Sequence, residues 1–245
     1  MRSFGLVGKT LKHSFSKKYF EEKFAAEHLT DCIYLNYELE DINKLNSLLK
    51  QPGLSGLNVT IPYKEAVIPF LTDMNDVVRE TGACNCIKIR NGKISGFNTD
   101  AIAFLKLLQN NDISPKEQAL VLGSGGASKA IQYALKMYGI HFKKVSRKKS
   151  ADGLVYDELE EEIMRSHLLI INTTPVGMFP HEDNYPAISY EFLGAKHILI
   201  DLVYNPPKTR FLQLGEDKGA KIMNGHEMLV LQAEESWRIW NDSSL

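Results

Sequence analysis

Apolar residues follow two alternating patterns along this chain. Short apolar runs predict buried strands, and apolar residues at every third or fourth position predict helices between them. Alternation of strand and helix is typical of an α/β protein. The predicted strands cover residues 3–7, 33–37, 57–61, 86–90, 93–97, 119–122, 142–146, 167–171, 197–202 and 220–223. The predicted helices cover residues 17–28, 42–49, 101–108, 127–138, 210–214 and 226–240, with a short one that closes over 77–80.

One stretch organises the rest of the pattern. The strand 119–122 leads into Gly123-Ser124-Gly125-Gly126-Ala127, and a helix follows. Strand, glycine turn and helix in this order open a dinucleotide-binding fold, whose backbone N–H groups hold the pyrophosphate. Gly123 allows the tight turn, and Gly125 lets the phosphates approach the backbone. Ser128 replaces the third glycine of the usual pattern and is small enough for close packing.

The loop after the next predicted strand indicates which dinucleotide binds. An NAD site usually has an acidic residue about 20 positions past the glycine turn, where it binds the ribose 2′-hydroxyl. Here that position is basic, with Ser146, Arg147 and Lys148. A basic loop suits a 2′-phosphate, so we predict NADP as the cofactor. The alternative is a solvated basic loop without a ligand.

Other polar residues stand at the ends of predicted elements, where structural roles compete with chemical ones. Ser14 and Ser16 precede a helix, so they suit helix caps, the more common use, or a small carboxylate ligand. Lys64 follows a strand ended by Pro62, where open α/β sheets bind ligands, but a solvated surface lysine has the same signature. Asp100 stands at an expected helix N-cap. The pattern alone leaves these alternatives open.

Composition excludes several classes of partner. The 29 Lys and Arg residues nearly balance the 30 Asp and Glu residues, so no overall charge attracts nucleic acid or an anionic membrane. The three cysteines include a Cys-x-Cys pair that fits half-buried thiols better than a zinc site, so we expect no metal. No long apolar run or signal-like start is present. We expect a cytoplasmic protein, monomer or homodimer, that acts on a small molecule.

The loops described above, taken in order, closely resemble the shikimate dehydrogenase family over nearly the whole chain. The family's Ser-x-Ser, Asn-Val-Thr-x-Pro-x-Lys, Gly-Ala-x-Asn and Asn-Thr-Asp motifs match residues 14–16, 58–64, 82–85 and 98–100. The glycine turn, the segment 172–178, Tyr204 and the Met-Leu-x-x-Gln sequence at 228–232 also agree. Lys148 departs from the family pattern by replacing a hydroxyl with a charge, whereas the departures at Lys17, Phe20 and Ala103 remove no proposed chemical group.

The resemblance implies a fold and a reaction. It implies two α/β domains, a substrate-binding domain (residues 1–100 plus 226–245) and a Rossmann-type NADP-binding domain (residues 101–225), with the active site in the cleft between them. The implied enzyme is an NADP-dependent oxidoreductase that reversibly reduces 3-dehydroshikimate to shikimate, in aromatic amino acid biosynthesis. Lys64 and Asp100 would act at the reacting oxygen. The implied substrate-binding residues are Ser14, Ser16, Thr60, Asn85, Tyr204 and Gln232. The implied cofactor-binding residues are Gly123, Ser124, Gly125, Gly126, Ala127, Ser146, Arg147, Lys148, Thr173 and Gly225.

Two alternatives stay open. The first is a quinate/shikimate dehydrogenase that also uses NAD, against which Ser14, Ser16 and the basic pair Arg147-Lys148 argue. The second is a non-catalytic, NADPH-sensing protein on the same fold, since a fold does not determine a function. The presence of both Lys64 and Asp100 argues against this second alternative.

Overall fold

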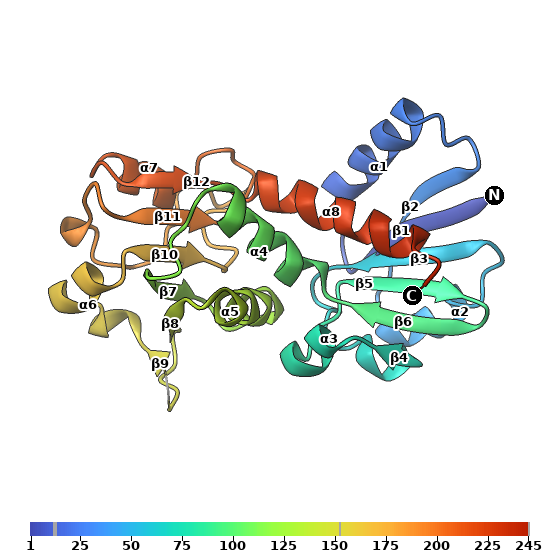
Figure 1. The fold of residues 1–245 in the computed structure, drawn as a ribbon, viewed down its shortest axis with the longest axis horizontal. Helices are drawn as coiled ribbons and strands as arrows, with labels where there is room; N and C mark the ends of the chain where they lie inside the picture. The colour runs from blue at the N-terminus through green and yellow to red at the C-terminus, as the bar shows by residue number, and fades with distance from the viewer. Residues whose placement is uncertain (12–13, 152, 245) are drawn as a thin grey trace. The chain divides into compact units, whose positions relative to one another are not determined.

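The computed structural model describes residues 1–11, 14–151 and 153–244. The chain forms two compact units (Figure 1). The first unit comprises Met1–Thr99 and Gln232–Leu245, and the second comprises Asp100–Leu231. Each unit contains one six-stranded sheet covered by helices. The predicted fold class of two α/β units is therefore confirmed.

The sheet of the first unit is mixed, with the strand order β2-β1-β3-β5-β6-β4. β1 is parallel to β2 and β3, β5 is antiparallel to β3 and β6, and β4 is parallel to β6. Asn91 and Gly92, both at positive φ, form the tight turn between β5 and β6. The strands are β1 (Arg2–Gly8), β2 (Cys32–Glu38), β3 (Leu54–Val59), β4 (Asp73–Met74), β5 (Cys86–Arg90) and β6 (Lys93–Phe97).

Successive residues of these strands face two apolar clusters, one on each side of the sheet. One cluster joins Phe4 of β1 to Phe20 of α1 and Trp240 of α8, with the Phe4 and Trp240 rings stacked at 4.8 Å. The other joins Val7 of β1 to Leu45 of α2 and to residues of α3. These helices are α1 (Phe15–Ala26), α2 (Leu45–Leu48), α3 (Asp76–Thr81) and α8 (His226–Asn241), with the 3-10 turns η1 (Ile42–Lys44) and η2 (Ile68–Phe70).

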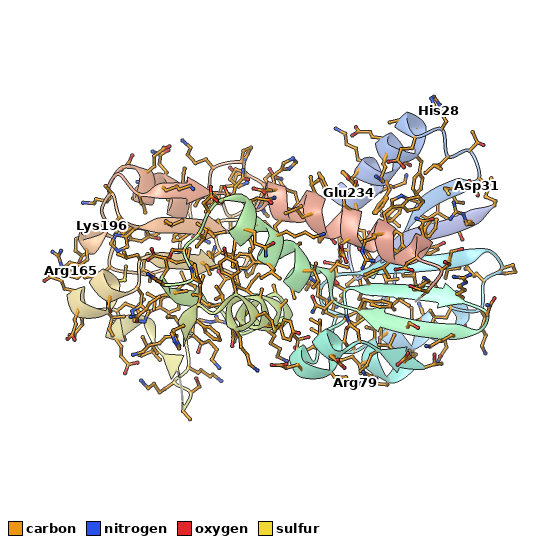
Figure 2. The ribbon with its side chains drawn as sticks, in the orientation of Figure 1. His28, Asp31, Arg79, Arg165, Lys196 and Glu234 are labelled. Carbon is orange, nitrogen blue, oxygen red and sulfur yellow. The ribbon has the colours of Figure 1, made fainter. Side chains whose placement is uncertain are left out.

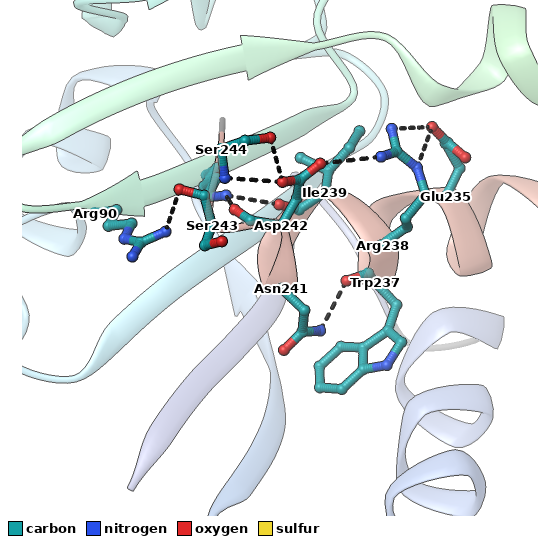
Figure 3. Close-up of polar contacts among 10 residues, drawn as sticks. Arg90, Glu235, Trp237, Arg238, Ile239, Asn241, Asp242, Ser243 and Ser244 are labelled. Carbon is teal, nitrogen blue, oxygen red and sulfur yellow. Dashed lines mark hydrogen bonds and ion pairs between the residues drawn. The ribbon is translucent and has the colours of Figure 1, made fainter.

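The C-terminal part of α8 is held in the first unit by polar contacts as well. Lys88 Nζ of β5 donates to the carbonyl oxygen of Ile239 at 2.8 Å and to that of Asp242. A cation there satisfies helix carbonyl groups that have no partner within the helix. Figure 3 shows the last turn, in which Arg238 bridges Glu235 and Asp242 at 2.8 and 3.3 Å.

Contacts between α8 and α1 complete the first unit. Glu234 of α8 accepts a hydrogen bond from Lys23 Nζ at 2.9 Å and another from the Tyr19 phenol. Figure 2 labels Glu234 on the helix. Burial and the Glu234 carboxylate together raise the pKa of Tyr19. The segment from Gln232 onward is therefore packed into the first unit along its length.

The sheet of the second unit is entirely parallel, with the order β12-β11-β10-β7-β8-β9. Counted from β7, this is the order 3-2-1-4-5-6 of Rossmann-type dinucleotide-binding sheets. The strands are β7 (Gln118–Leu122), β8 (His141–Val145), β9 (Gly153–Leu154), β10 (Leu169–Asn172), β11 (Ile198–Asp201) and β12 (Lys221–Met223).

Helices cover both faces of this parallel sheet, as its burial requires. Ala119 and Val121 of β7 pack with α4, α5 and Met228, whereas Leu120 and Leu122 pack with α6 and α7. The helices are α4 (Thr99–Asn110), α5 (Gly126–Tyr138), α6 (Glu161–Ser166) and α7 (Arg210–Glu216), with the 3-10 turns η3 (Tyr156–Glu158) and η4 (Tyr190–Phe192).

The structure corrects several predicted elements. β3 ends at Val59 rather than at residue 61, because the Tyr63 N–H donates back to the Thr60 carbonyl oxygen at 2.9 Å. Residues 42–48 form η1 and then α2 instead of one helix. β4, β9 and α6 lie outside the predicted elements, since two-residue strands and a six-residue helix are too short to show a period. β10 is consequently the fourth strand of its unit in chain order.

Candidate active site

The glycine turn after β7 has the geometry that its sequence predicts. Gly123 has a φ of 119°, and a Cβ there would lie 2.6 Å from Thr173 Oγ1. Only glycine fits both the backbone angle and the close contact. Ser128 is buried and donates to the Gly123 carbonyl oxygen at 2.8 Å. The serine in place of the third glycine therefore closes the turn with a hydrogen bond.

The N-terminus of α5 is open to a ligand. Gly125 is the N-cap, no side chain caps it, and a Cβ built there meets no described atom within 4 Å. Ser124 and Gly125 are exposed, and Gly126 and Ala127 are half-buried. Uncapped N–H groups at a helix start beside open space suit an anion. The residues present therefore fit the pyrophosphate of a dinucleotide.

The loop after β8 presents two exposed cations. Ser146 Oγ donates to the Lys148 carbonyl oxygen at 2.7 Å, which folds the loop on itself. Lys149 is paired with Glu158 at 2.5 Å. Arg147 and Lys148 are exposed, and none of the described residues forms a salt bridge with either. Their charges are consequently available for a phosphate.

Two buried polar residues lie side by side where β10 and β11 end. Asn172 and Asp201 are register partners and fully buried. Asn172 Nδ2 donates to Asp201 Oδ1 at 2.9 Å, and Thr209 Oγ1 donates to Asp201 Oδ2 at 2.6 Å. Asn172 Oδ1 accepts from the Thr174 N–H at 3.1 Å. Burial raises the pKa of Asp201 to about 6. We call Asn172, Thr174, Asp201 and Thr209 the second-unit network.

Three further predicted residues follow the carboxyl ends of β10, β11 and β12. The N–H and Oγ1 of Thr173 both donate to the Leu122 carbonyl oxygen, at 2.9 and 2.6 Å. Tyr204 is half-buried, and burial raises its pKa. Gly225 packs so closely that a Cβ would lie 2.2 Å from the Leu202 carbonyl oxygen. This edge is where open α/β sheets bind their ligands.

In the first unit, the two predicted serines have different surroundings. Ser14 is the N-cap of α1, and its Oγ accepts from the Lys17 N–H at 3.4 Å, so the capping interpretation is correct for this residue. Ser16 is buried in the first turn, and its hydroxyl lies near the phenol of Tyr34. Burial raises the pKa of Tyr34 well above its ordinary value, and the Ser16 hydroxyl opposes that rise. Binding of a carboxylate by either serine stays a prediction.

Thr60 and Lys64 lie in the turn that follows β3. The Thr60 N–H donates to the Val7 carbonyl oxygen at 2.9 Å, and the Lys64 carbonyl oxygen accepts from the Cys84 N–H at 2.7 Å. Burial raises the pKa of the Cys84 thiol to about 12, and the nearby Lys64 charge opposes that rise. Lys64 is half-buried. It is therefore not a fully solvated surface lysine.

Asn85 fixes the start of α4. Its Oδ1 accepts from the Thr99 N–H at 2.6 Å, and its Nδ2 donates to Thr99 Oγ1 at 3.0 Å. α4 accordingly begins at Thr99, and Asp100 lies in its first turn instead of at the expected N-cap. Asp100 is buried, in a position where the helix dipole favours a carboxylate.

Ser236 of α8 links these groups beneath the surface. It accepts from Asn58 Nδ2 at 2.8 Å, donates to the Gln232 carbonyl oxygen at 2.8 Å, and lies 3.3 Å from Thr99 Oγ1. The Tyr34 phenol donates to Asn58 Oδ1 at 2.8 Å. All of these residues, Gln232 included, are buried. We call Tyr34, Asn58, Asn85, Thr99 and Ser236 the first-unit network.

The cysteines have no part in these networks as ligands or bridges. All three are free thiols, and Cys84 and Cys86 are fully buried instead of half-buried as predicted. Within residues 1–11, 14–151 and 153–244, no group of three or more His, Cys, Asp and Glu side chains could hold a metal ion. Within the same residues, no helix is both long and apolar enough to cross a membrane.

Comparison with known proteins identifies the family. Residues 6–87 match the model of the shikimate dehydrogenase substrate binding domain. The shikimate dehydrogenase (NADP(+)) of Clostridium beijerinckii is 38% identical over 259 residues, which cover 100% of this chain and 94% of that protein. The chain belongs to the shikimate dehydrogenase family. The resemblance inferred from the loop motifs is thus confirmed.

Solved structures of the family agree with this fold. The shikimate dehydrogenase of Aquifex aeolicus has a TM-score of 0.89 at 33% identity, covering 98% of this chain and 92% of that chain. The enzyme of Thermus thermophilus, in complex with NADP(H) and shikimate, has a TM-score of 0.87 at 30% identity, covering 98% of this chain and 94% of that chain.

Local sequence motifs locate the loops but not the buried residues that hold them. Asn58 and Asn172 lie inside the motifs at 58–64 and 172–178, and Asp201 is the one charged residue of the buried strand β11, so each had a local signal. Tyr34 and Ser236 had none, because their partners are distant in the chain.

Proposed function

We propose that this protein is an NADP-dependent shikimate dehydrogenase, which reversibly reduces 3-dehydroshikimate to shikimate in aromatic amino acid biosynthesis. The observation that carries the proposal is 38% identity to an enzyme of that name over all of this chain. Every chemical group that the reaction needs is present at its motif position in this sequence. A cytoplasmic monomer or homodimer that acts on a small molecule is the form we expect.

The second unit supplies the groups that would bind NADP. The backbone of Gly123–Ala127 at the start of α5 would hold the pyrophosphate, because its N–H groups are uncapped. Arg147 and Lys148 would bind the 2′-phosphate through exposed charges, with Ser146 shaping their loop. Thr173 and Gly225 would lie at the nicotinamide end. When bound, NADPH supplies the hydride that reduces the ketone.

The first unit supplies most of the groups for the substrate. Hydroxyls of Ser14, Ser16 and Thr60 would hold its carboxylate. The amides of Asn85 and Gln232 would bind ring hydroxyls, and the half-buried Tyr204 of the second unit would add a further polar contact. The buried Asn85 and Gln232 would lose affinity for a substrate that lacks their partner hydroxyl, since their polar groups would then be unpaired.

Lys64 would provide the proton. Reduction of a ketone places negative charge on oxygen, and an ammonium group there stabilises that charge and donates to it. The carboxylate of Asp100 would orient the same oxygen and the lysine. The rigid start of α4, held by Asn85, supports this role for Asp100, because it fixes the backbone one residue before it.

One spectrophotometric experiment separates this function from the two alternatives. The wild-type protein is assayed with shikimate or quinate, each with NADP or NAD. Fast turnover of shikimate with NADP alone supports the proposal. Turnover of quinate, or equal use of NAD, would instead indicate a quinate/shikimate dehydrogenase. NADP binding without turnover of either substrate would indicate a sensor.

A further inference from the structure

The carboxyl ends of three strands in the second unit lie in one row. Leu122 of β7 pairs with Asn172 of β10, which pairs in turn with Asp201 of β11. The loops that leave this row carry Gly123, Thr173 and Tyr204. These loops would bind the cofactor and part of the substrate, so what holds the row together sets the geometry of both.

Asp201 accepts hydrogen bonds from three different segments. Its Oδ1 accepts from Asn172 Nδ2 at 2.9 Å and from the Val203 N–H at 3.0 Å. Its Oδ2 accepts from Thr209 Oγ1 at 2.6 Å. Thr209 in turn is the N-cap of α7 and accepts from the Leu212 N–H at 3.4 Å. The carboxylate therefore ties the loop 203–209 at both of its ends.

Asn172 extends the same linkage to the preceding loop. Its Oδ1 accepts from the N–H and the Oγ1 of Thr174, at 3.1 and 2.6 Å, and its Nδ2 also reaches the Val176 carbonyl oxygen at 3.4 Å. Thr173 and Thr174 then contact Gly123, since a Cβ at Gly123 would lie 2.6 Å from Thr173 Oγ1 and 3.1 Å from Thr174 Cγ2. Direct contacts thus run from Asp201 to the glycine turn.

We propose that Asp201 is a positioning residue that holds the loop 173–178 and the loop 203–209 in fixed register. The roles of Thr173 and Tyr204 in this inference rest on the proposed function, but the contacts do not. A fully buried carboxylate is costly unless donors satisfy it. Three donors satisfy this one, from the end of β10, the loop 203–209 and the N-cap of α7, so removal of the acceptor takes a buried hydrogen-bond partner from each of them.

The decisive variants change the acceptor and keep the number and branching of the side-chain heavy atoms. Asp201→Leu removes every hydrogen bond to the side chain. Asp201→Asn keeps one oxygen, which still accepts from Asn172 and Val203. Asp217→Asn is the matched control, because Asp217 is exposed at the end of α7 and lies outside the network.

Hydrogen–deuterium exchange is measured on each unliganded protein, and NADP+ binding is measured by calorimetry. For Asp201→Leu we expect at least roughly tenfold faster exchange in 173–178 and 203–209, and roughly tenfold weaker NADP+ binding, with β7 unchanged. Asp201→Asn and Asp217→Asn should remain within about threefold of the wild type. Unchanged exchange in 173–178 would overturn the proposal, and so would faster exchange throughout the second unit.

Two further outcomes are covered by the same design. If Asp201→Leu does not fold, Thr209→Val is measured in its place, because it removes one hydrogen bond at nearly constant volume. The proposal then requires faster hydrogen exchange in 203–209 and unchanged exchange in β7. If the wild-type protein binds no NADP+, the proposed function fails, and the exchange data still decide whether Asp201 positions the loops.

Discussion

The two units hold their candidate site residues by buried networks of different chemistry. The first-unit network consists of neutral hydroxyl, phenol and amide groups. The second-unit network centres on a carboxyl group, that of Asp201, whose pKa burial raises to about 6. Neutral groups keep the same donors and acceptors across the pH range in which enzymes work. A carboxylate accepts only, but gains a donor when it is protonated.

This difference determines which part of the site can respond to pH. We expect the proposed substrate-binding groups of the first unit to keep their geometry from acid to mildly basic solution. Protonation of Asp201 would convert a carboxylate oxygen that only accepts hydrogen bonds into a hydrogen-bond donor. The second unit is therefore the one whose loops we expect to depend on pH.

The largest effect should come from removing the chemistry of the first unit alone. Lys64→Met keeps the bulk of the side chain and removes the ammonium group, so kcat should fall by roughly 10²- to 10⁴-fold. The KM for shikimate should change less, because the interaction strengthens in the transition state. NADP+ affinity, measured by calorimetry, should stay at the wild-type value.

Lys93→Met is the matched control, because Lys93 forms a surface ion pair with Asp73 at 2.7 Å and should keep normal turnover. Turnover within a few-fold of the wild type in Lys64→Met would remove Lys64 from the reaction. The double variant with Asp100→Asn should be far less than additive if the two residues act as one unit.

The next effect should fall on the second unit alone. Arg147→Ala should raise the KM for NADP by roughly 10- to 100-fold, because a charge-assisted bond to phosphate is lost, while kcat and NAD use change little. Arg165→Ala is the control, since the exposed Arg165, labelled in Figure 2, forms an ion pair with Glu161 of the same helix α6 at 2.7 Å. An equal rise of KM for both cofactors would contradict 2′-phosphate binding by Arg147.

A smaller effect tests the neutral network. Ser236→Ala should lower the free energy of unfolding by about 1–3 kcal/mol, because Asn58 Nδ2 loses its 2.8 Å partner inside the unit. The KM for shikimate should rise as Asn85 and Gln232 loosen. Both losses should be equal at pH 6 and pH 8, measured by urea unfolding and steady-state kinetics. Ser166→Ala, an exposed helical serine, should stay within about 0.5 kcal/mol.

Patterns confined to a few neighbouring residues predicted most of this fold. The strand, glycine turn and helix from residue 118 to 138 are visible because each period lies within its own segment. β4 and β9 each have two residues, which cannot display an alternation, and they pair only because longer strands lie beside them. Tertiary contact therefore decides whether the residues of β4 and β9 form strands.

The candidate site divides in the same way. Lys64, Asp100 and the glycine turn lie at the ends of predicted strands and helices. This position alone made them candidate site residues. The bond from Asn58 to Ser236 joins residues 178 positions apart, and no local pattern encodes it. Asp201 is the last residue of the buried strand β11, but its hydrogen bonds depend on Asn172 and Thr209, which are 29 and 8 positions away.

The smallest predicted effect distinguishes the two networks directly. The pKa of Asp201 is about 6 in the folded protein against 3.8 ordinarily. Its contribution to stability is therefore complete below pH 3.8 and is lost as pH rises through 6. Asp201→Asn does not titrate at this position. The free energy of unfolding of the variant, measured with urea and taken relative to that of the wild type, should therefore increase by about 1.5 kcal/mol between about pH 5 and pH 7.5.

The neighbours of Asp201 support assignment of that change to this carboxyl group. Its hydrogen-bond partners Asn172, Val203 and Thr209 do not titrate, and the Tyr190 phenol, whose pKa is raised by burial and by the Asp201 charge, stays protonated throughout. Ser236→Ala measured at the same two pH values should show no such change. If the stability difference between Asp201→Asn and the wild type is constant with pH, the second-unit network behaves as a neutral one. That result would contradict the proposed difference between the two networks.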